Sequence, residues 1–141
     1  MLNFQVSWLA LITVALVNFF LSWLFYSPVV PWFKTWLTGI GVDPNKSGPT
    51  DEEKKAMPRL MIGALVATFL FSYGLQVLVH SLGAVTFGAG ALAGFVCWFT
   101  FALTHSLNTQ FEGRRPVVLL INNILYLVTY VGFGGLIALF H

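Results

Sequence analysis

The residues whose types and spacing could do chemistry are polar side chains set inside long apolar stretches. They are amides, hydroxyls and one imidazole, which hydrogen-bond to other helices, to a small molecule or to a headgroup. The candidates are Asn18, Ser22, Tyr26, Thr104, His105, Asn108, Asn122, Asn123 and Tyr126. Because Asn18, Ser22 and Tyr26 are four apart, a helix places them on one face. The same spacing joins Thr104 to Asn108.

Catalytic and metal chemistry are not expected from the same pattern. No Asp or Glu lies within the apolar stretches, so the sequence does not predict a carboxylate-based proton or cation relay. Ser81 adjoins His80, but neighbours on a helix point about 100° apart and do not form a nucleophile–base pair. His80 and His105 fall at opposite ends of their spans, ~25–30 Å apart, too far to share a metal. A His80–His141 pair stays open. We expect no enzyme, no metal site and no cofactor.

The composition indicates that lipid surrounds most of the chain. Of its 141 residues, 57% are hydrophobic and 9% are charged, whereas a typical soluble domain has about 25% charged residues. Aromatic residues make up 16% and include five Trp, which suits two interfacial belts. The net charge of +2 is too small to indicate a nucleic-acid partner. Cys97 is alone, so it forms no internal disulfide.

Four apolar stretches are long enough to cross a membrane as helices. At about 1.5 Å per residue, each covers a hydrocarbon core of roughly 30 Å. The predicted spans are residues 4–27, 58–80, 86–107 and 116–140. We therefore expect an all-α membrane protein, a single domain over residues 1–141 with four transmembrane helices in an antiparallel bundle.

The segment between the first two spans, residues 28–57, carries turn and anchor signals. Two prolines end the first helix, and the sequence WFKTWL at 32–37 predicts a short interfacial helix with its aromatic side chains on one face. Residues 50–53, TDEE, match a capping box. The second long helix therefore begins either near Asp51, continuing through a proline, or at that proline, Pro58.

The basic residues define an orientation. With four spans, loops 28–57 and 108–115 lie on one side, and the turn 80–85 lies on the other side with both termini. All Lys and Arg residues fall on the two-loop side: Lys34, Lys46, Lys54, Lys55, Arg59, Arg114 and Arg115. The positive-inside rule makes that side cytoplasmic and places both termini outside. The three arginines either attract an anionic lipid headgroup such as cardiolipin or act only as anchors.

This topology brings the polar candidates to a similar depth, near the cytoplasmic face. Asn18 and its stripe lie in the inner half of the first span, Thr104 and its neighbours in the inner half of the third, and Asn122 two turns into the fourth. One interpretation is hydrogen bonding between helices, with Asn122 facing the stripe of Asn18, Ser22 and Tyr26, at ~0.6 kcal/mol per bond. The other is a polar cavity, open to the cytoplasm, that binds a small molecule or headgroup.

Two more patterns concern the helix surfaces. Gly90 and Gly94 form a small-xxx-small surface, which lets another helix approach closely or only reflects how common Gly and Ala are in membrane helices. A polar stripe follows the second span at four-residue steps through Thr68, Ser72, Gln76 and His80. With the inner cluster, this stripe could form a discontinuous polar track for a neutral solute.

Several motifs resemble a known family. They are NFFLSWLFYSP at 18–28, PWFKTW at 31–36, GFVCW at 94–98, FEGRRP at 111–116 and IN at 121–122. The sequence resembles, over nearly its whole length, the small bacterial membrane proteins grouped as domain of unknown function 1761. Thr100 departs from the family pattern, which has Gly there. The resemblance implies a four-span protein of the bacterial inner membrane, with both termini periplasmic in the orientation above, and implies no activity.

Two functions compete at this stage. The first is a small packing or accessory subunit that self-associates, through the third or fourth helix, or joins a larger membrane complex. The alternative is an oligomeric carrier or pore for a small neutral solute or lipid. The expected partners are the lipid bilayer and a second copy or larger assembly. An ordered ligand in the polar cluster would favour the carrier, whereas direct side-chain bonds without a void would favour the subunit.

Overall fold

The computed structural model describes residues 1–140, and every regular element in that range is helical. The elements are α1 (Trp8–Phe25), α2 (Phe33–Gly39), α3 (Asp51–Ser81), α4 (Phe87–Cys97), the π-helical turn η1 (Trp98–Ala102), α5 (Leu103–Asn108), the 3₁₀ turn η2 (Thr109–Glu112) and α6 (Pro116–Ile137). Because α4, η1 and α5 follow without a break, they form one long helix, Phe87–Asn108. His141, and with it the predicted His80–His141 pair, lies outside the described residues.

Four helices of the described chain are long and apolar enough to cross a membrane: α1, α3, Phe87–Asn108 and α6. This confirms the predicted all-helical class with four candidate spans. The first helix begins at Trp8 rather than at residue 4, because Ser7 has extended backbone and its Oγ accepts the N–H of Ala10 at 3.4 Å. The fourth ends at Ile137 rather than at residue 140.

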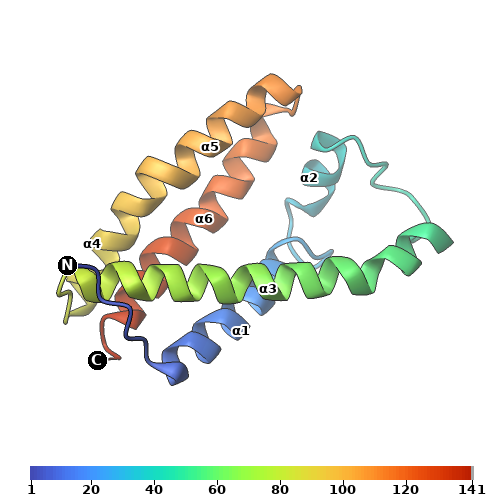
Figure 1. Cartoon of the computed structure of the whole chain (residues 1–141). Helices are drawn as coiled ribbons and strands as arrows, with labels where there is room; N and C mark the ends of the chain where they lie inside the picture. The colour runs from blue at the N-terminus through green and yellow to red at the C-terminus, as the bar shows by residue number, and fades with distance from the viewer. Residues whose placement is uncertain (141) are drawn as a thin grey trace.

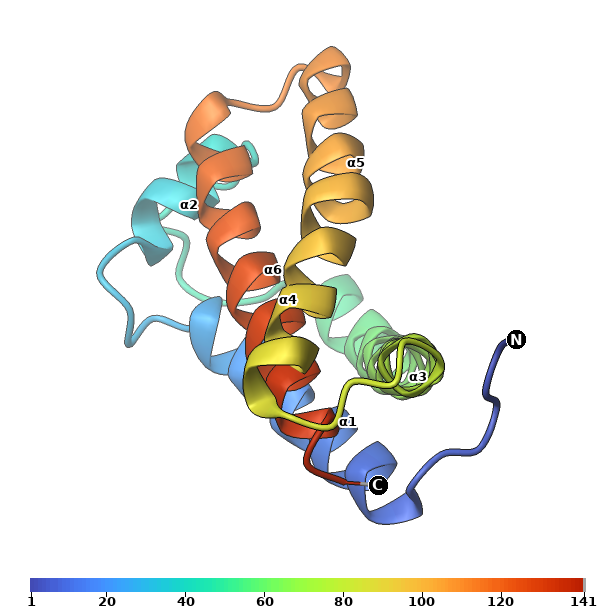
Figure 2. The ribbon, with the colours of Figure 1, turned by 90° about the vertical axis from the view of Figure 1, so that its left-hand side faces the viewer.

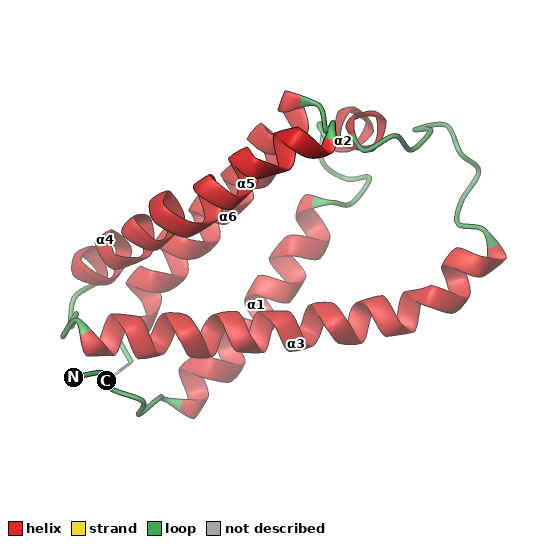
Figure 3. Ribbon diagram, turned by 45° about the horizontal axis from the view of Figure 1, so that its top comes forward, coloured by secondary structure: helices red, strands yellow, loops and turns green. Residues whose placement is uncertain are grey.

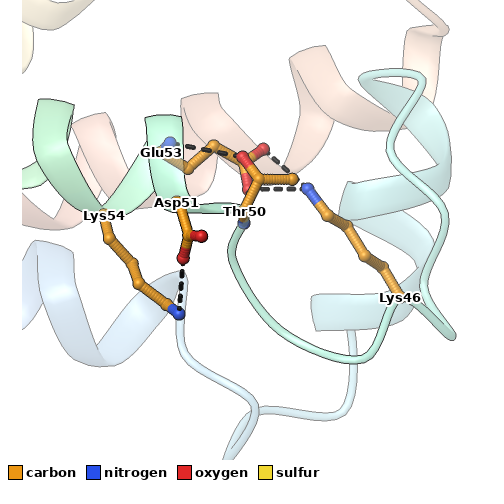
Figure 4. A network of polar contacts seen from close by, with 5 residues as sticks. All are labelled: Lys46, Thr50, Asp51, Glu53 and Lys54. Atoms are coloured by element: carbon orange, nitrogen blue, oxygen red, sulfur yellow. Dashed lines mark hydrogen bonds and ion pairs between the residues drawn. The ribbon is translucent and has the colours of Figure 1, made fainter.

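The start of α3 is fixed by a network of polar contacts (Figure 4). The Thr50 hydroxyl accepts the N–H of Glu53 at 3.3 Å, and the Glu53 carboxylate accepts the N–H of Thr50 at 2.7 Å, which is a reciprocal capping box. Lys46 pairs with the same carboxylate at 2.6 Å. Because of this cap, α3 begins at Asp51 and runs on through its internal proline, which is the first of the two predicted starts.

The long helices form an open V, and the predicted antiparallel bundle is not confirmed (Figures 1 and 3). Helix α6 runs antiparallel to α4 and α5, while α3 leaves the α3–α4 turn and diverges from them (Figures 1 and 2). Helix α1 bridges the two arms, because it contacts both α3 and α6. Both termini lie at the closed end of the V, and α2 lies at the open end (Figure 3). We call these the terminal end (residues 1–7, 82–86 and 138–140) and the loop end (residues 26–50 and 109–115).

Apolar side chains from all four long helices meet near the terminal end. The buried core there includes Val14, Leu75, Val79, Ala93, Phe133 and Ile137. Towards the loop end α3 loses these neighbours, and its first half, residues 51–64, is exposed on every side. The core therefore sets where the two arms join, and the space between the arms opens beyond it.

Glycines bring α4 and α6 into backbone contact. A methyl group added at Gly90 would collide with the carbonyl oxygen of Gly134, and one at Gly94 would collide with that of Tyr130. Such close approach is possible only where neither helix has a side chain in the way. The small-xxx-small surface is therefore occupied by α6 of the same chain, and self-association through Gly90 and Gly94 would require the two helices to separate.

Polar side chains of α3 bind the backbone of α1 and of the segment before it. The Ser72 hydroxyl donates to the carbonyl of Leu11 at 3.1 Å, and the Gln76 side-chain oxygen accepts the N–H of Ser7 at 3.0 Å. Both side chains are fully buried. These residues belong to the stripe predicted as part of a solute track, and their hydrogen bonds instead join two helices.

Helix α2 covers the loop end of α1 and α6. The ring of Trp36 packs against that of Tyr26 at a tilt of 38°, with centroids 4.7 Å apart. Gly39 lies against Val118 of α6 so closely that a methyl group would collide with its side chain. The aromatic residues predicted to face a membrane interface thus pack in part against the chain itself.

Candidate functional site

A cavity of about 400 Å³ lies between the arms of the V, where four helical segments surround it. Helix α1 supplies Asn18 and Ser22, α3 supplies Thr68, and α6 supplies Tyr126 and Tyr130. The remaining lining residues are Ala67, Phe71, Phe101, Ala102, His105, Leu125 and Thr129. Most of the wall is apolar, with a few polar groups that converge from different helices, which is the usual make-up of a small-molecule pocket.

The predicted polar cluster divides into three groups. Four of its members line the cavity: Asn18, Ser22, His105 and Tyr126. Three others lie in or beside direct hydrogen bonds between helices: Tyr26, Asn122 and Asn123. The last two, Thr104 and Asn108, are exposed and outside the cavity. The nine residues therefore do not form a single site.

The bonded group fastens α6 to its neighbours near the loop end. The Tyr26 hydroxyl donates to the Asn122 side-chain oxygen at 2.8 Å, so Asn122 bonds to one member of the stripe that it was expected to face. The Asn123 amide donates to the Ser106 hydroxyl at 2.6 Å and to the Leu119 carbonyl at 2.9 Å. These bonds join helices and give the three residues a structural role, although the side-chain oxygen of Asn123 is buried without a partner in the described residues.

The π-helical turn explains why Thr104 and Asn108 face outward. The Thr100 hydroxyl donates to the carbonyl of Val96 at 2.7 Å, which competes with the regular helical bonds of that carbonyl. The N–H of Leu103 then reaches back five residues to Trp98. One extra residue in the turn rotates everything after it by about 100°, since each helical residue advances by that angle. Thr104 and Asn108 are therefore rotated away from the face that regular spacing predicts for them.

Sequence reasoning missed Ser106, Thr129 and Tyr130. The first became buried only because of the π-helical turn, which no sequence pattern announces. Tyr130 had a usable signal, because it lies four residues after Tyr126 on the same face of α6. Thr68 was placed in the α3 stripe but not in the cluster, since the bridging path of α1 between the arms was not foreseen.

The hydrogen-bonding capacity of the cavity is only partly used by the chain. Within the described residues, the side chains of Asn18, Ser22 and His105 make no hydrogen bond, although Asn18 is only 8% exposed. Thr68 and Thr129 donate to carbonyls of their own helices, at 2.8 and 3.0 Å, and keep their oxygen lone pairs. Donors and acceptors are thus available to a molecule in the cavity.

Charge is missing from the wall of this cavity. Among the described residues that line it there is no Asp, Glu, Lys or Arg. Within residues 1–140, no three His, Cys, Asp or Glu side chains gather closely enough to hold a metal ion. The arrangement therefore suits a molecule that forms hydrogen bonds without carrying charge.

The three arginines named as headgroup candidates do not share one site. Arg114 and Arg115 line a second cavity at the loop end, beside Trp36 of α2. Arg59 lies on the exposed first half of α3, and no lining residue of that cavity comes from α3. His80 is also remote from this group, with its Nδ1 3.2 Å from the carbonyl oxygen of Gln5 at the terminal end.

The fold and its cavity define a class: an all-helical protein with four helices able to span a membrane and an uncharged pocket between them. Residues 9–138 match the family described as "Protein of unknown function (DUF1761)". The chain belongs to this family, as its motifs predicted. No curated protein and no solved structure matches the sequence.

Proposed function

We propose that the chain is an integral membrane protein of the bacterial inner membrane whose loop end faces the cytoplasm. The proposal rests on the positions of its charges. All seven Lys and Arg residues belong to the loop end or to the first turns of α3 that adjoin it. Residues 1–7 and 82–86, at the terminal end, carry none. Under the positive-inside rule this asymmetry places both termini outside.

The function that the geometry supports best is binding of a small neutral or amphipathic molecule within the membrane, as a carrier or receptor would bind it. One observation carries this proposal: the cavity between the arms holds unpaired polar groups of Asn18, Ser22 and His105 in a mostly apolar wall. Polar side chains at membrane depth usually bond to other helices, and these do not. A ligand with one or two hydrogen-bonding groups would satisfy them.

The proposed role is binding rather than catalysis. His105 is the one imidazole in the described lining, and no carboxylate stands beside it to orient the ring. The volume of about 400 Å³ lies within the range of ligand pockets and admits a small molecule or part of a lipid chain. Oligomers would be needed for a continuous path, because the α3 stripe beyond Thr68 is engaged by α1.

Co-purification tests this proposal without knowledge of the ligand. The wild-type chain and Ser22→Leu, which fills the cavity, are purified from the same membranes in a mild detergent, and bound small molecules are identified by mass spectrometry. Thr13→Leu is the matched control, since Thr13 is exposed on α1 and does not line the cavity. We expect a molecule that is retained by Thr13→Leu and lost from Ser22→Leu. Equal recovery from both variants, or none from wild type, would overturn the proposal.

A second candidate is an accessory subunit, and one observation favours it. The first half of α3 is exposed on every side and carries apolar side chains, including Met57, Leu60 and Ile62. The glycine surface of α4 is occupied within the chain, and this half of α3 offers a partner an exposed apolar surface in its place. A cysteine at position 60, with Cys97→Ser, should then cross-link to another chain in membranes. Exclusive recovery of uncross-linked monomer would count against this role.

A further inference from the structure

A second cavity, of about 620 Å³, lies at the loop end and differs from the first in chemistry. It is formed between the end of α2 and the turn that leads into α6. Its lining residues are Trp36, Thr38, Gly39, Ile40, Gly41, Glu112, Gly113, Arg114 and Arg115. This cavity is charged, whereas the cavity between the arms is not.

Two guanidinium groups and one carboxylate give this lining a net positive charge. Arg114 is paired through its Nε with Glu112 at 3.2 Å, while Arg115 makes no ion pair within the described residues. The Arg114–Glu112 pair is about half exposed on both sides, so it is weak. Because a guanidinium has five N–H donors, Arg114 keeps most of them for another acceptor.

The indole of Trp36 lines the same cavity. Its Nε1 is buried and has no acceptor within the described residues. The ring is held in place by Tyr26 and by Phe33, whose centroids lie 4.7 and 6.4 Å from its own.

We propose that this cavity binds a phosphate group, held by Arg115 and by the free donors of Arg114, beside the ring of Trp36. Phosphate oxygens accept bidentate hydrogen bonds from arginine, and a planar guanidinium suits them better than an ammonium does. The group could belong to an anionic lipid headgroup or be free phosphate, and the chemistry of recognition is the same for both. Arg59, which is remote from the cavity, takes no part.

The test follows the indole N–H of Trp36 by NMR. The full chain, labelled with ¹⁵N at its indoles, is kept in dodecyl maltoside and titrated separately with dihexanoyl-phosphatidylglycerol and with inorganic phosphate, at matched ionic strength. Trp36→Phe assigns the resonance. We expect a saturable shift of the Trp36 signal. A response to the lipid alone identifies a headgroup site, and a response to both probes identifies a site for phosphate itself.

Arginine variants separate a site from general surface charge. Arg115→Gln should weaken binding at least ~10-fold, the loss expected for a charge-assisted hydrogen bond. Arg115→Lys keeps the charge but not the bidentate geometry, so it should weaken binding by less. Arg59→Gln removes the same charge on α3 and should leave the affinity unchanged. The proposal fails if neither probe shifts Trp36, or if Arg59→Gln weakens binding as much as Arg115→Gln.

Discussion

The two main helix contacts of this molecule are built in opposite ways. Helices α4 and α6 touch through glycines, with carbonyl oxygens lying where side chains would otherwise be. Helices α1 and α3 are joined by side-chain hydrogen bonds to backbone, such as Ser72 to Leu11. The first contact depends on residues without side chains, and the second depends on a few polar side chains.

This difference explains where a cavity can form. Glycine packing holds α4 and α6 close over much of their length, which leaves no space between them. The hydrogen bonds of α3 reach α1 only from Ser72 towards the terminal end. Beyond that residue α3 diverges, and polar side chains such as Asn18 and Ser22 line the cavity without a hydrogen-bond partner in the described part of the chain.

The largest effect should follow from breaking the glycine contact. Gly94→Ala places a methyl group against the carbonyl oxygen of Tyr130, and we expect a loss of about 1–3 kcal/mol in unfolding free energy, the usual range for overpacking. Reversible unfolding in mixed micelles measures it. Gly88→Ala on the same helix is the control, because a methyl group there meets nothing within 4 Å. Equal destabilisation by both variants would mean that the contact is not as close as described.

A smaller effect should follow from removing a hydrogen bond of the other contact. In the Gln76→Leu variant the leucine is similar in size to glutamine but cannot accept the N–H of Ser7. We therefore expect the unfolding free energy to fall by about 0.6–1.7 kcal/mol. Faster amide exchange at Ser7 would show that the lost bond is the cause. A stability equal to wild type, with unchanged exchange, would show that the α1–α3 contact does not rely on its polar stripe.

The smallest effect should lie outside both contacts, at the exposed cap of α3. The Lys46 ammonium and the Thr50 N–H hold the pKa of the Glu53 carboxyl below its usual value. Because this pKa is lowered in the folded chain, the ionised carboxyl stabilises the cap at pH values above its ordinary pKa of about 4.3. That stabilisation is lost as the pH falls through the lowered pKa. Lys46→Ala should therefore raise the Glu53 pKa in a ¹³C NMR titration. Lys55→Ala, the control, should not.

Local patterns in the sequence predicted the helices well and their arrangement poorly. The capping box at Thr50 and the apolar lengths of the spans are short-range features, and they determine where helices form. The divergence of α3 depends on contacts between distant residues. The glycines at 90 and 94 indicated a close contact without showing that α6 of the same chain would fill it.

The candidate site was predicted only in part, because regular spacing predicts a shared face only where the helix is regular. Regular spacing placed Asn18 and Ser22 on one face correctly, because α1 is a regular helix. It failed for Thr104 and Asn108, because the π-helical turn before them changes the phase. Thr100 lies within that turn, and its hydroxyl bonds back to the carbonyl of Val96.

The most direct test of the central claim is an experimental structure of the chain, purified from its own membranes into lipid nanodiscs. The claim is that the space between the arms is a ligand-binding cavity. We expect ordered density there within hydrogen-bonding distance of Asn18 and of Ser22 or His105, while Tyr26 remains bonded to Asn122. A closed space, in which Asn18 bonds directly to another helix and no density lies between α1, α3 and α6, would contradict it.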